Sequence, residues 1–273
     1  MVRVMVDNVN TDGLRFSAAE IVELRKYTLH PGARDTLVRV FEDHFIEGQE
    51  TAGIRIGGIY LDDSDPDRFV WFRGFTDLDQ RMEALESFYF GPVWEEHRAV
   101  ANGTMIDSDD VLLLRPTDPP HRPREPATST TPWPSDDRAH VSVYVYEADL
   151  ELEDWLSTVL HRCLEELLGT TVATWRSHPG PNAFTKLPVR TDNAFVWAAS
   201  FPDNDARRHA LDRLHISPEW TTEVAPVIDS RITVQALDLR PTNRSRHPRP
   251  TGPGVDPLGT SLIIDSRSRT RSS

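Results

Sequence analysis

The amino-acid sequence repeats itself once. The motif Phe69-Val70-Trp71 recurs as Phe195-Val196-Trp197, 126 positions further along the chain. Other matches keep the same order and nearly the same spacing: Phe75-Thr76-Asp77 with Phe201-Pro202-Asp203, Ala84-Leu85 with Ala210-Leu211, Pro92-Val93-Trp94 with Pro218-Glu219-Trp220, and Ile106-Asp107-Ser108 with Ile228-Asp229-Ser230. Ordered matches at a fixed spacing indicate a duplicated structural unit. The chain therefore has to build its fold from two copies of one unit.

Shifts in composition mark the borders of the two copies. We expect an N-terminal extension over 1–19, a first repeat over 20–117 and a second, diverged repeat over 139–243. Residues 118–138 are rich in proline and lack apolar periodicity, which predicts an extended linker. Residues 244–273 are mostly Arg, Ser, Pro and Gly, which predicts a disordered tail.

Each repeat shows a β-α-β-β-α-β pattern. In the first, strands are predicted at 20–29, 53–61, 67–75 and 109–116, and helices at 33–49, 77–89 and 92–103. In the second, strands are predicted at 139–147, 170–176, 193–201 and 231–240, helices at 150–168 and 203–214, and a longer loop at 177–191. This order is typical of the ferredoxin-like split βαβ unit, whose sheet leaves one face uncovered. We predict an α+β fold in which the two sheets pack face to face within one chain.

Composition excludes several classes of protein. Of 273 residues 38% are hydrophobic, enough for a packed core, and the net charge of −13 argues against a nucleic-acid partner. No apolar run is long enough to span a membrane and no signal peptide is evident, so we expect a cytoplasmic protein. The single cysteine, Cys163, excludes an internal disulfide and a multi-cysteine metal site, and is expected to be inert core.

Four segments of the first repeat resemble the NIPSNAP family: IVELRKYTLHPG at 21–32, GGIYLDD at 57–63, DRFVWFRGFTDLDQR at 67–81 and GPVWEEHRAVANGTMIDSDDVLLLRP at 91–116. That family belongs to the dimeric α+β barrel superfamily, so the resemblance implies that the two repeats form such a barrel within one chain. Some NIPSNAP proteins are linked with vesicles or mitochondrial signalling. Relatives with the same barrel include cofactor-free monooxygenases, haem-binding proteins, muconolactone-type isomerases and polyketide cyclases. The resemblance implies the fold and leaves the reaction open.

The first strand carries a polar face, because Glu23, Arg25 and Tyr27 alternate with Val22 and Leu24. We expect the apolar face to meet the helices and the polar face to point into the space between the sheets, where a ligand would bind. Arg25 would orient a carboxylate or enolate oxygen, with Tyr27 as hydrogen-bond donor. The alternative is a structural ion pair of Glu23 and Arg25 that fills the barrel.

Neighbouring strands offer further candidates for ligand contact. The third strand lies beside the first in a split βαβ unit, so Trp71 and Arg73 are expected on the same face. The second repeat places His140, Ser142, Tyr144 and Tyr146 roughly where the first has Glu23, Arg25 and Tyr27. The tryptophans are interpreted as core, with the wall of a pocket for an aromatic ligand as the alternative for Trp71 and Trp197.

The segment after the second helix borders the cavity mouth in this class of barrel. Trp94 is therefore a candidate lining residue, and His97 a candidate general base near neutral pH. For His97 the alternative is a packing role at a helix end. His44, three positions after Phe41, is expected to be a half-buried helix residue.

No metal or cofactor is predicted. The histidines lack an H-x-x-x-H or 2-His-1-carboxylate spacing, although haem needs only one axial ligand and stays open at His97, His140 or His161. Gly57-Gly58 lies inside a predicted strand, which indicates a bulge or close packing rather than a phosphate-binding loop.

Two functions of different class fit the sequence. The first is a cofactor-independent oxygenase, isomerase or cyclase of secondary metabolism, acting on a small aromatic or polyketide-like molecule in the barrel cavity. The second is a non-catalytic small-molecule-binding or scaffold protein of NIPSNAP type. A polar cavity favours the first, and a barrel filled by its own aromatic side chains favours the second. We expect a monomer with a pseudo-dimeric barrel, or a homodimer of it.

Overall fold

The computed structural model describes residues 19–117, 140–170 and 172–245. The predicted linker, the predicted extension before Ala19 and the predicted tail from residue 246 onward lie outside the described residues. Within the part that is described, no helix combines the length and apolar character needed to cross a membrane.

Repeat 1 forms four strands, and its helices cover one face of the resulting sheet. Asp77 caps the longest helix, since its side chain accepts a hydrogen bond from the Gln80 amide at 2.8 Å. The elements are β1 (Ile21–Leu29), α1 (Arg34–Val40), the π-helical turn η1 (Phe41–Phe45), α2 (Ile46–Thr51), β2 (Arg55–Asp62), β3 (Arg68–Phe75), α3 (Leu78–Tyr89), α4 (Pro92–Asn102) and β4 (Met105–Pro116).

Repeat 2 follows the same order. Asp203 caps its helix as Asp77 does in repeat 1, and accepts from the Ala206 amide at 2.7 Å. The elements are β5 (His140–Glu147), the short turn η2 (Leu150–Leu152), α5 (Glu153–Trp155), the π-helical turn η3 (Leu156–Leu160), α6 (His161–Leu168), β6 (Val172–Ser177), β7 (Ala194–Phe201), α7 (Asn204–Ile216), the π-helical turn η4 (Trp220–Val224), α8 (Ala225–Arg231) and β8 (Thr233–Pro241).

The helical segment η4–α8 is absent from the sequence-based prediction. It occupies the place of α4 in the second repeat, and the recurrence of Pro92 and Trp94 as Pro218 and Trp220 is the signal that would have located it.

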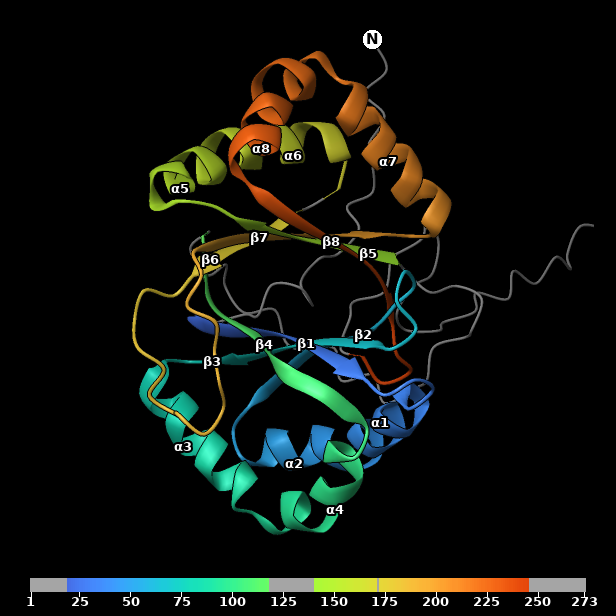
Figure 1. The fold of residues 1–273 in the computed structure, drawn as a ribbon, viewed down its shortest axis with the longest axis vertical. Helices are drawn as coiled ribbons and strands as arrows, with labels where there is room; N and C mark the ends of the chain where they lie inside the picture. The colour runs from blue at the N-terminus through green and yellow to red at the C-terminus, as the bar shows by residue number, and fades with distance from the viewer. Residues whose placement is uncertain (1–18, 118–139, 171, 246–273) are drawn as a thin grey trace, which may run out of the picture.

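The eight strands close into one antiparallel barrel in the order β1-β3-β2-β8-β5-β7-β6-β4. Each repeat supplies a four-stranded sheet, and the sheets join where β2 pairs with β8 and β4 pairs with β6. Figure 1 shows the two sheets facing each other, with α1–α4 below one and α5–α8 above the other. The predicted α+β architecture, two split βαβ units packed sheet to sheet within one chain, is confirmed.

The barrel interior is filled by its own side chains. Apolar side chains from both sheets form its core, and Phe72 packs on Trp175 with ring centroids 5.6 Å apart. Lys26, on the same face of β1 as Val22 and Leu24, pairs there with Asp110 and donates to Gln235. An eight-stranded barrel is wide enough for side chains to fill or for one small ligand, and here the side chains fill it.

The orientation of β1 is opposite to the one predicted. Val22 and Leu24 point into the barrel core, and Tyr27 packs in the core between sheet and helices. Glu23 and Arg25 alternate with Val22 and Leu24, so they lie on the helix side with Tyr27. Alternation shows which residues share a face but not which face meets the helices. On the helix side, Arg81 of α3 pairs with Glu23, and Gln49 of α2 accepts a hydrogen bond from Arg73.

Strand β2 carries a bulge where it pairs with β3. The β2–β3 register shifts between Ile56 and Ile59, which confirms a bulge at Gly57-Gly58. A Cβ atom on Gly58 would lie 1.9 Å from the Tyr60 hydroxyl, so the bend requires glycine there.

The chain after β8 packs on repeat 1. The Ile59 amide donates to Ser245 Oγ at 2.9 Å, and the Arg244 guanidinium contacts the Glu42 carbonyl and the Glu47 carboxylate. The prediction of a tail that starts at 244 was therefore wrong for its first two residues, because a buried amide and two acidic residues hold them.

Candidate functional site: a cavity between sheet and helices of repeat 1

A cavity of about 310 Å³ opens between the sheet of repeat 1 and its helices. Its wall is largely aromatic and holds two cationic side chains. The lining residues are Arg25, Tyr27, Tyr89, Phe90, Trp94, Asn102, Met105, Ser108, Phe184, Lys186 and Leu187. A second, smaller cavity beside it shares Tyr27, Tyr89, Trp94 and Met105 and adds Trp71. A volume of this size, with aromatic rings and several polar groups in its wall, is enough for a small molecule.

Behind the cavity, one carboxylate binds three arginines. Glu23 accepts from Arg25 Nη1 at 2.8 Å, from Arg73 Nε at 2.7 Å and from Arg81 Nε at 2.6 Å. All four side chains are buried. This cluster, hereafter the Glu23 cluster, carries three positive charges and one negative charge, so it holds excess positive charge inside the protein.

The strand register builds this cluster. Glu23 on β1 lies directly opposite Arg73 on β3, and Arg25 lies opposite Trp71. Arg81 reaches the same carboxylate from the first turns of α3. The predicted neighbourhood of Glu23, Arg25, Trp71 and Arg73 on one face therefore exists, but on the helix side of the sheet.

The Glu23 carboxylate stays ionised and serves as a structural counter-ion. Burial opposes its charge, yet Arg73, Arg81 and Arg25 together lower the pKa of Glu23 far below its ordinary value. A carboxylate with so low a pKa and three bound arginines is not a general base.

Arg25 and Tyr27 form the polar end of the cavity. Arg25 Nε donates to the Tyr27 hydroxyl at 2.9 Å, so the hydroxyl proton of Tyr27 remains available for another acceptor. Burial raises the pKa of Tyr27, and the neighbouring Arg25 only partly opposes this. Tyr27 is therefore a neutral donor at pH 7, held beside a guanidinium that also lines the cavity.

Aromatic rings surround the buried arginines. The Arg73 guanidinium lies 5.2 Å from the centre of the Trp71 ring and 5.9 Å from that of Tyr89, and Arg25 lies 5.8 Å from Trp71. Such cation–π contacts offset part of the cost of burying charge. The rings of Tyr89 and Trp94, whose centroids are 4.7 Å apart, form part of the cavity wall.

Repeat 2 closes the cavity of repeat 1. The segment between β6 and β7, residues 178–193, leaves its own repeat and runs down beside α3, as the yellow loop in Figure 1 shows. We call this segment the strap. It contributes Phe184, Lys186 and Leu187 to the cavity wall.

The strap is held at both ends by β4. The His178 amide donates to the Leu113 carbonyl at 2.7 Å, and the Arg190 amide donates to the Val111 carbonyl at 2.8 Å. In its middle, Asn182 accepts from Arg81 Nη1 at 3.1 Å, which ties the strap to the Glu23 cluster.

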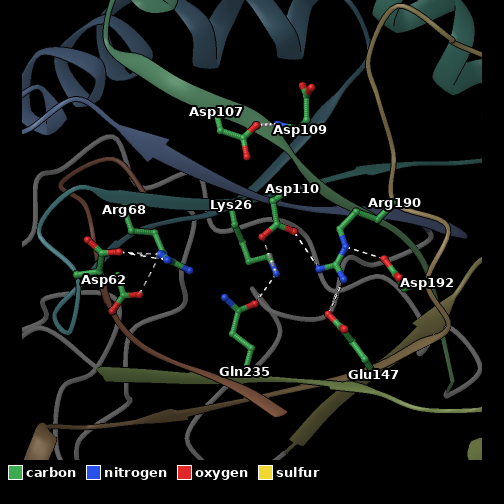
Figure 2. Close-up of polar contacts among 11 residues, drawn as sticks. Lys26, Asp62, Arg68, Asp107, Asp109, Asp110, Glu147, Arg190, Asp192 and Gln235 are labelled. Atoms are coloured by element: carbon green, nitrogen blue, oxygen red, sulfur yellow. Dashed lines mark hydrogen bonds and ion pairs between the residues drawn. The ribbon is translucent and has the colours of Figure 1, made fainter. Parts of the chain in front are cut away.

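Arg190 makes the strongest polar anchor of the strap. Its guanidinium contacts Asp110 at 3.2 Å, Glu147 at 2.5 Å and Asp192 at 2.8 Å (Figure 2). Asp110 also pairs with the buried Lys26, 3.1 Å away, which donates to Gln235 at 2.5 Å. This network joins β1, β4, β5 and β8 near the strap and leaves Lys26 with a structural role.

The sequence reasoning missed the strap residues and Arg81. The loop at 177–191 is longer than the turn between β2 and β3, and that excess length was the available signal. Nothing in the sequence showed that the loop crosses to the other repeat.

The predicted site residues separate into several places. Arg25, Tyr27 and Trp94 line the larger cavity, Trp71 lines the smaller one, and Glu23 and Arg73 lie behind them. His97 does not line the cavity; its ring stacks on His44 with centroids 3.7 Å apart.

Tyr144, Tyr146 and Trp197 belong to the helix layer of repeat 2, with Tyr144 stacked on Trp197 at 4.4 Å. The expectation that they share a pocket with Arg25 was wrong, because the filled barrel separates the two helix layers.

The register explains why repeat 2 lacks the cluster. Tyr144 pairs with Trp197 as Arg25 pairs with Trp71, and Ser142 pairs with Ala199 as Glu23 pairs with Arg73. Of the three arginine positions in the Glu23 cluster, only that of Arg81 has an arginine in repeat 2. This residue, Arg207, pairs with Asp238.

The three histidines considered for haem lie outside the cavity wall. His140 lies 3.6 Å from Asp238, and His161 lies 3.4 Å from Glu165, in addition to the stacked His97.

Comparison with known proteins agrees with this architecture. Residues 22–119 match the NIPSNAP family model. The match spans nearly all of repeat 1. Among curated proteins, none matches the chain.

Three solved structures share the barrel across most of the chain. A "putative monooxygenase" from Lactobacillus acidophilus is 12% identical, with 83% of this chain and 97% of that chain covered and a TM-score of 0.50. A "putative monooxygenase" from Fusobacterium nucleatum is 10% identical, covering 83% and 95%, with a TM-score of 0.52. An anthrone oxidase-like protein is 9% identical, covering 83% and 94%, with a TM-score of 0.53. At these identities the likeness concerns the fold alone, a closed α+β barrel built from two repeats in one chain.

Proposed function

We propose that the NIPSNAP domain binds a small aromatic molecule with an acidic hydroxyl, a phenol or an enol, and stabilises its oxyanion. One observation carries the proposal. Arg25 shares the carboxylate of Glu23 with two other arginines, and it lines an aromatic cavity beside the neutral donor Tyr27.

The charge of the Glu23 cluster favours an anion in the cavity. Buried charges are costly unless they are paired, and three guanidinium groups share one carboxylate here. An oxyanion next to Arg25 would supply part of the missing negative charge. The hydroxyl proton of Tyr27 would form a second hydrogen bond to the same oxygen.

Stabilisation of an enolate or phenolate is the step that cofactor-independent oxygenation, isomerisation and cyclisation share. The names of the barrel neighbours, two "putative monooxygenase" proteins and one anthrone oxidase-like protein, support a reaction of this group. An anthrone is a polycyclic aromatic ketone with an acidic enol, and an electron-rich planar ring fits a wall formed by Tyr89 and Trp94.

A second candidate is binding without turnover. None of the described residues that line the cavity is an aspartate, a glutamate or a histidine, so no conventional general base faces a ligand there. A scaffold or carrier role needs only the oxyanion contacts. The predicted base His97 supports neither candidate at this cavity.

The experiment measures the acidity of a bound probe, 2-naphthol, whose neutral and ionised forms differ in absorption. A site that stabilises the oxyanion lowers the pKa of the bound naphthol by about one unit or more, the scale expected from an adjacent guanidinium. Tyr27→Phe and Arg25→Met should each reduce this shift. Oxygen uptake with anthrone then separates the enzyme from the carrier.

The matched control is Tyr146→Phe, the same chemical change at the equivalent strand position of repeat 2. Tyr146 pairs with Phe195 as Tyr27 pairs with Phe69. The control should leave the pKa of the bound naphthol unchanged. The proposal is wrong if bound and free naphthol have the same pKa. It is also wrong if Tyr27→Phe and Tyr146→Phe change the pKa of bound naphthol equally.

A further inference from the structure

The strap brings one cationic side chain to the outer end of the cavity. Lys186 is exposed, and its Nζ lies 3.9 Å from the ring centre of Phe90, itself 64% exposed. Arg25, at the inner end, is 2% exposed. Both residues line the same cavity, with the rings of Tyr89 and Trp94 also in its wall.

The two cations differ in their partners. Arg25 is bound to Glu23 and Tyr27. Lys186 forms no ion pair with any residue in the described part of the chain, whereas the strap's other cation, Arg190, pairs with three carboxylates. Asn102 and Ser108, which also line the cavity, add polar groups to its wall. The outer end is thus a second polar end, with a positive charge that no carboxylate among the described residues neutralises.

We infer that the ligand is an aromatic acid that carries a second anionic group, and that Lys186 of the strap binds this group while Arg25 and Tyr27 hold the acidic hydroxyl. The inference rests on the proposed function and adds the substrate class to it. It also gives a reason for the duplication: repeat 2 has lost the charged cluster of repeat 1 and supplies the specificity-determining residue of its cavity instead.

Geometry supports this division of roles. The strap is fixed at both ends by backbone hydrogen bonds to β4, and Asn182 holds its middle by donating to the Leu187 carbonyl at 2.7 Å and accepting from the Phe184 amide at 3.2 Å. A loop so anchored presents Lys186 from a defined backbone position. A planar ring between Arg25 and Lys186 would direct one polar end inward and the other toward solvent.

The test compares two fluorescent probes with the same ring system. 2-Naphthol carries only the hydroxyl, and 6-hydroxy-2-naphthoate adds one carboxylate at the far end. We expect the full-length protein to bind the naphthoate about fivefold more tightly, the upper range for an ion pair near solvent. Lys186→Met should abolish this preference and leave the affinity for 2-naphthol within twofold of the wild-type value.

Two controls isolate the contact. Lys186→Arg keeps a cation on the strap and should keep most of the preference. Arg98→Met removes an exposed positive charge on α4 that pairs with Glu95 and does not line the cavity, so it should leave the preference intact. Loss of the preference in Arg98→Met would show that only the general field of the protein is measured.

The outcomes separate this inference from the proposed function. If Lys186→Met weakens both probes equally, or if the wild-type protein prefers 2-naphthol, Lys186 does not bind an anion and the inference is wrong. The proposed function survives that result as long as 2-naphthol binding still depends on Tyr27 and Arg25. Failure of both probes to bind overturns the proposed function and the inference together.

Discussion

Asn182 of repeat 2 accepts a hydrogen bond from Arg81 of repeat 1, with Oδ1 and Nη1 3.1 Å apart. Arg81 in turn binds Glu23, so a single side chain connects the strap to the charged cluster behind the cavity. The two repeats are therefore coupled at the site as well as through the barrel seams. The strap's conformation and the cluster's geometry should respond to the same substitution.

Asn182→Ala should loosen the strap. The substitution removes three hydrogen bonds: Asn182 accepts from the Arg81 guanidinium and from the Phe184 amide, and donates to the Leu187 carbonyl. Because cleavage in a folded protein reports local opening, limited trypsin digestion after Lys186 should become about tenfold faster. Thr185→Ala, at an exposed strap position, is the control and should leave the rate unchanged. Equal digestion rates for wild type and Asn182→Ala would show that backbone contacts alone hold the strap.

Glu23→Gln should destabilise the whole domain. The glutamine has the shape of glutamate but no charge, so three buried guanidinium groups lose their shared counter-ion. Removing one partner of a buried ion pair typically costs about 3–5 kcal/mol. Denaturant titration of the free energy of unfolding measures this, with the exposed Glu20→Gln as control. A loss below about 1 kcal/mol would mean that the arginines are solvated or paired in another way.

The same carboxylate predicts the response to acid. The pKa of Glu23 is lowered in the folded state, so the unfolded chain binds the proton more readily once the pH falls below the ordinary pKa of glutamate, about 4.3. The stabilisation from Glu23 is fully present above that value and is lost as the pH falls toward the folded pKa. The stability gap between wild type and Glu23→Gln should therefore shrink by about 1.4 kcal/mol per pH unit below pH 4.3. Curves that stay parallel down to pH 3 would contradict this.

Much of the fold could be predicted from the repeat and from local patterns. Alternation located β1, helical spacing located α1–α2, and Asp77 marked a helix start that the structure confirms. Gly57-Gly58 marked the bulge. These features depend on interactions within one repeat, which the sequence records at short spacing.

The site was harder to predict because its position depends on contacts between repeats. Alternation placed Arg25 and Glu23 on one face, yet the choice of face depended on where the helices pack against the sheet. The strap residue Phe184 comes from a loop more than 150 positions after Tyr27, without a motif that links the two. His97 looked like a base from its residue type, and only coordinates show that it stacks on His44.

Phe184 and Lys186 should have separable effects on binding. Phe184 is buried, lies 6.2 Å from the Tyr89 ring with nearly parallel planes, and lines the cavity. Because it offers an apolar face to any aromatic ring, Phe184→Ala should weaken 2-naphthol and 6-hydroxy-2-naphthoate by the same factor, about tenfold, equivalent to losing about 1.4 kcal/mol of ring contact. Their ratio should stay at the wild-type value, in contrast to Lys186→Met. Fluorescence titration gives both affinities, and thermal unfolding confirms that the variant is folded at the assay temperature. A change in the ratio in Phe184→Ala would show that the ring positions Lys186, and unchanged affinities would show that the probes do not reach the strap.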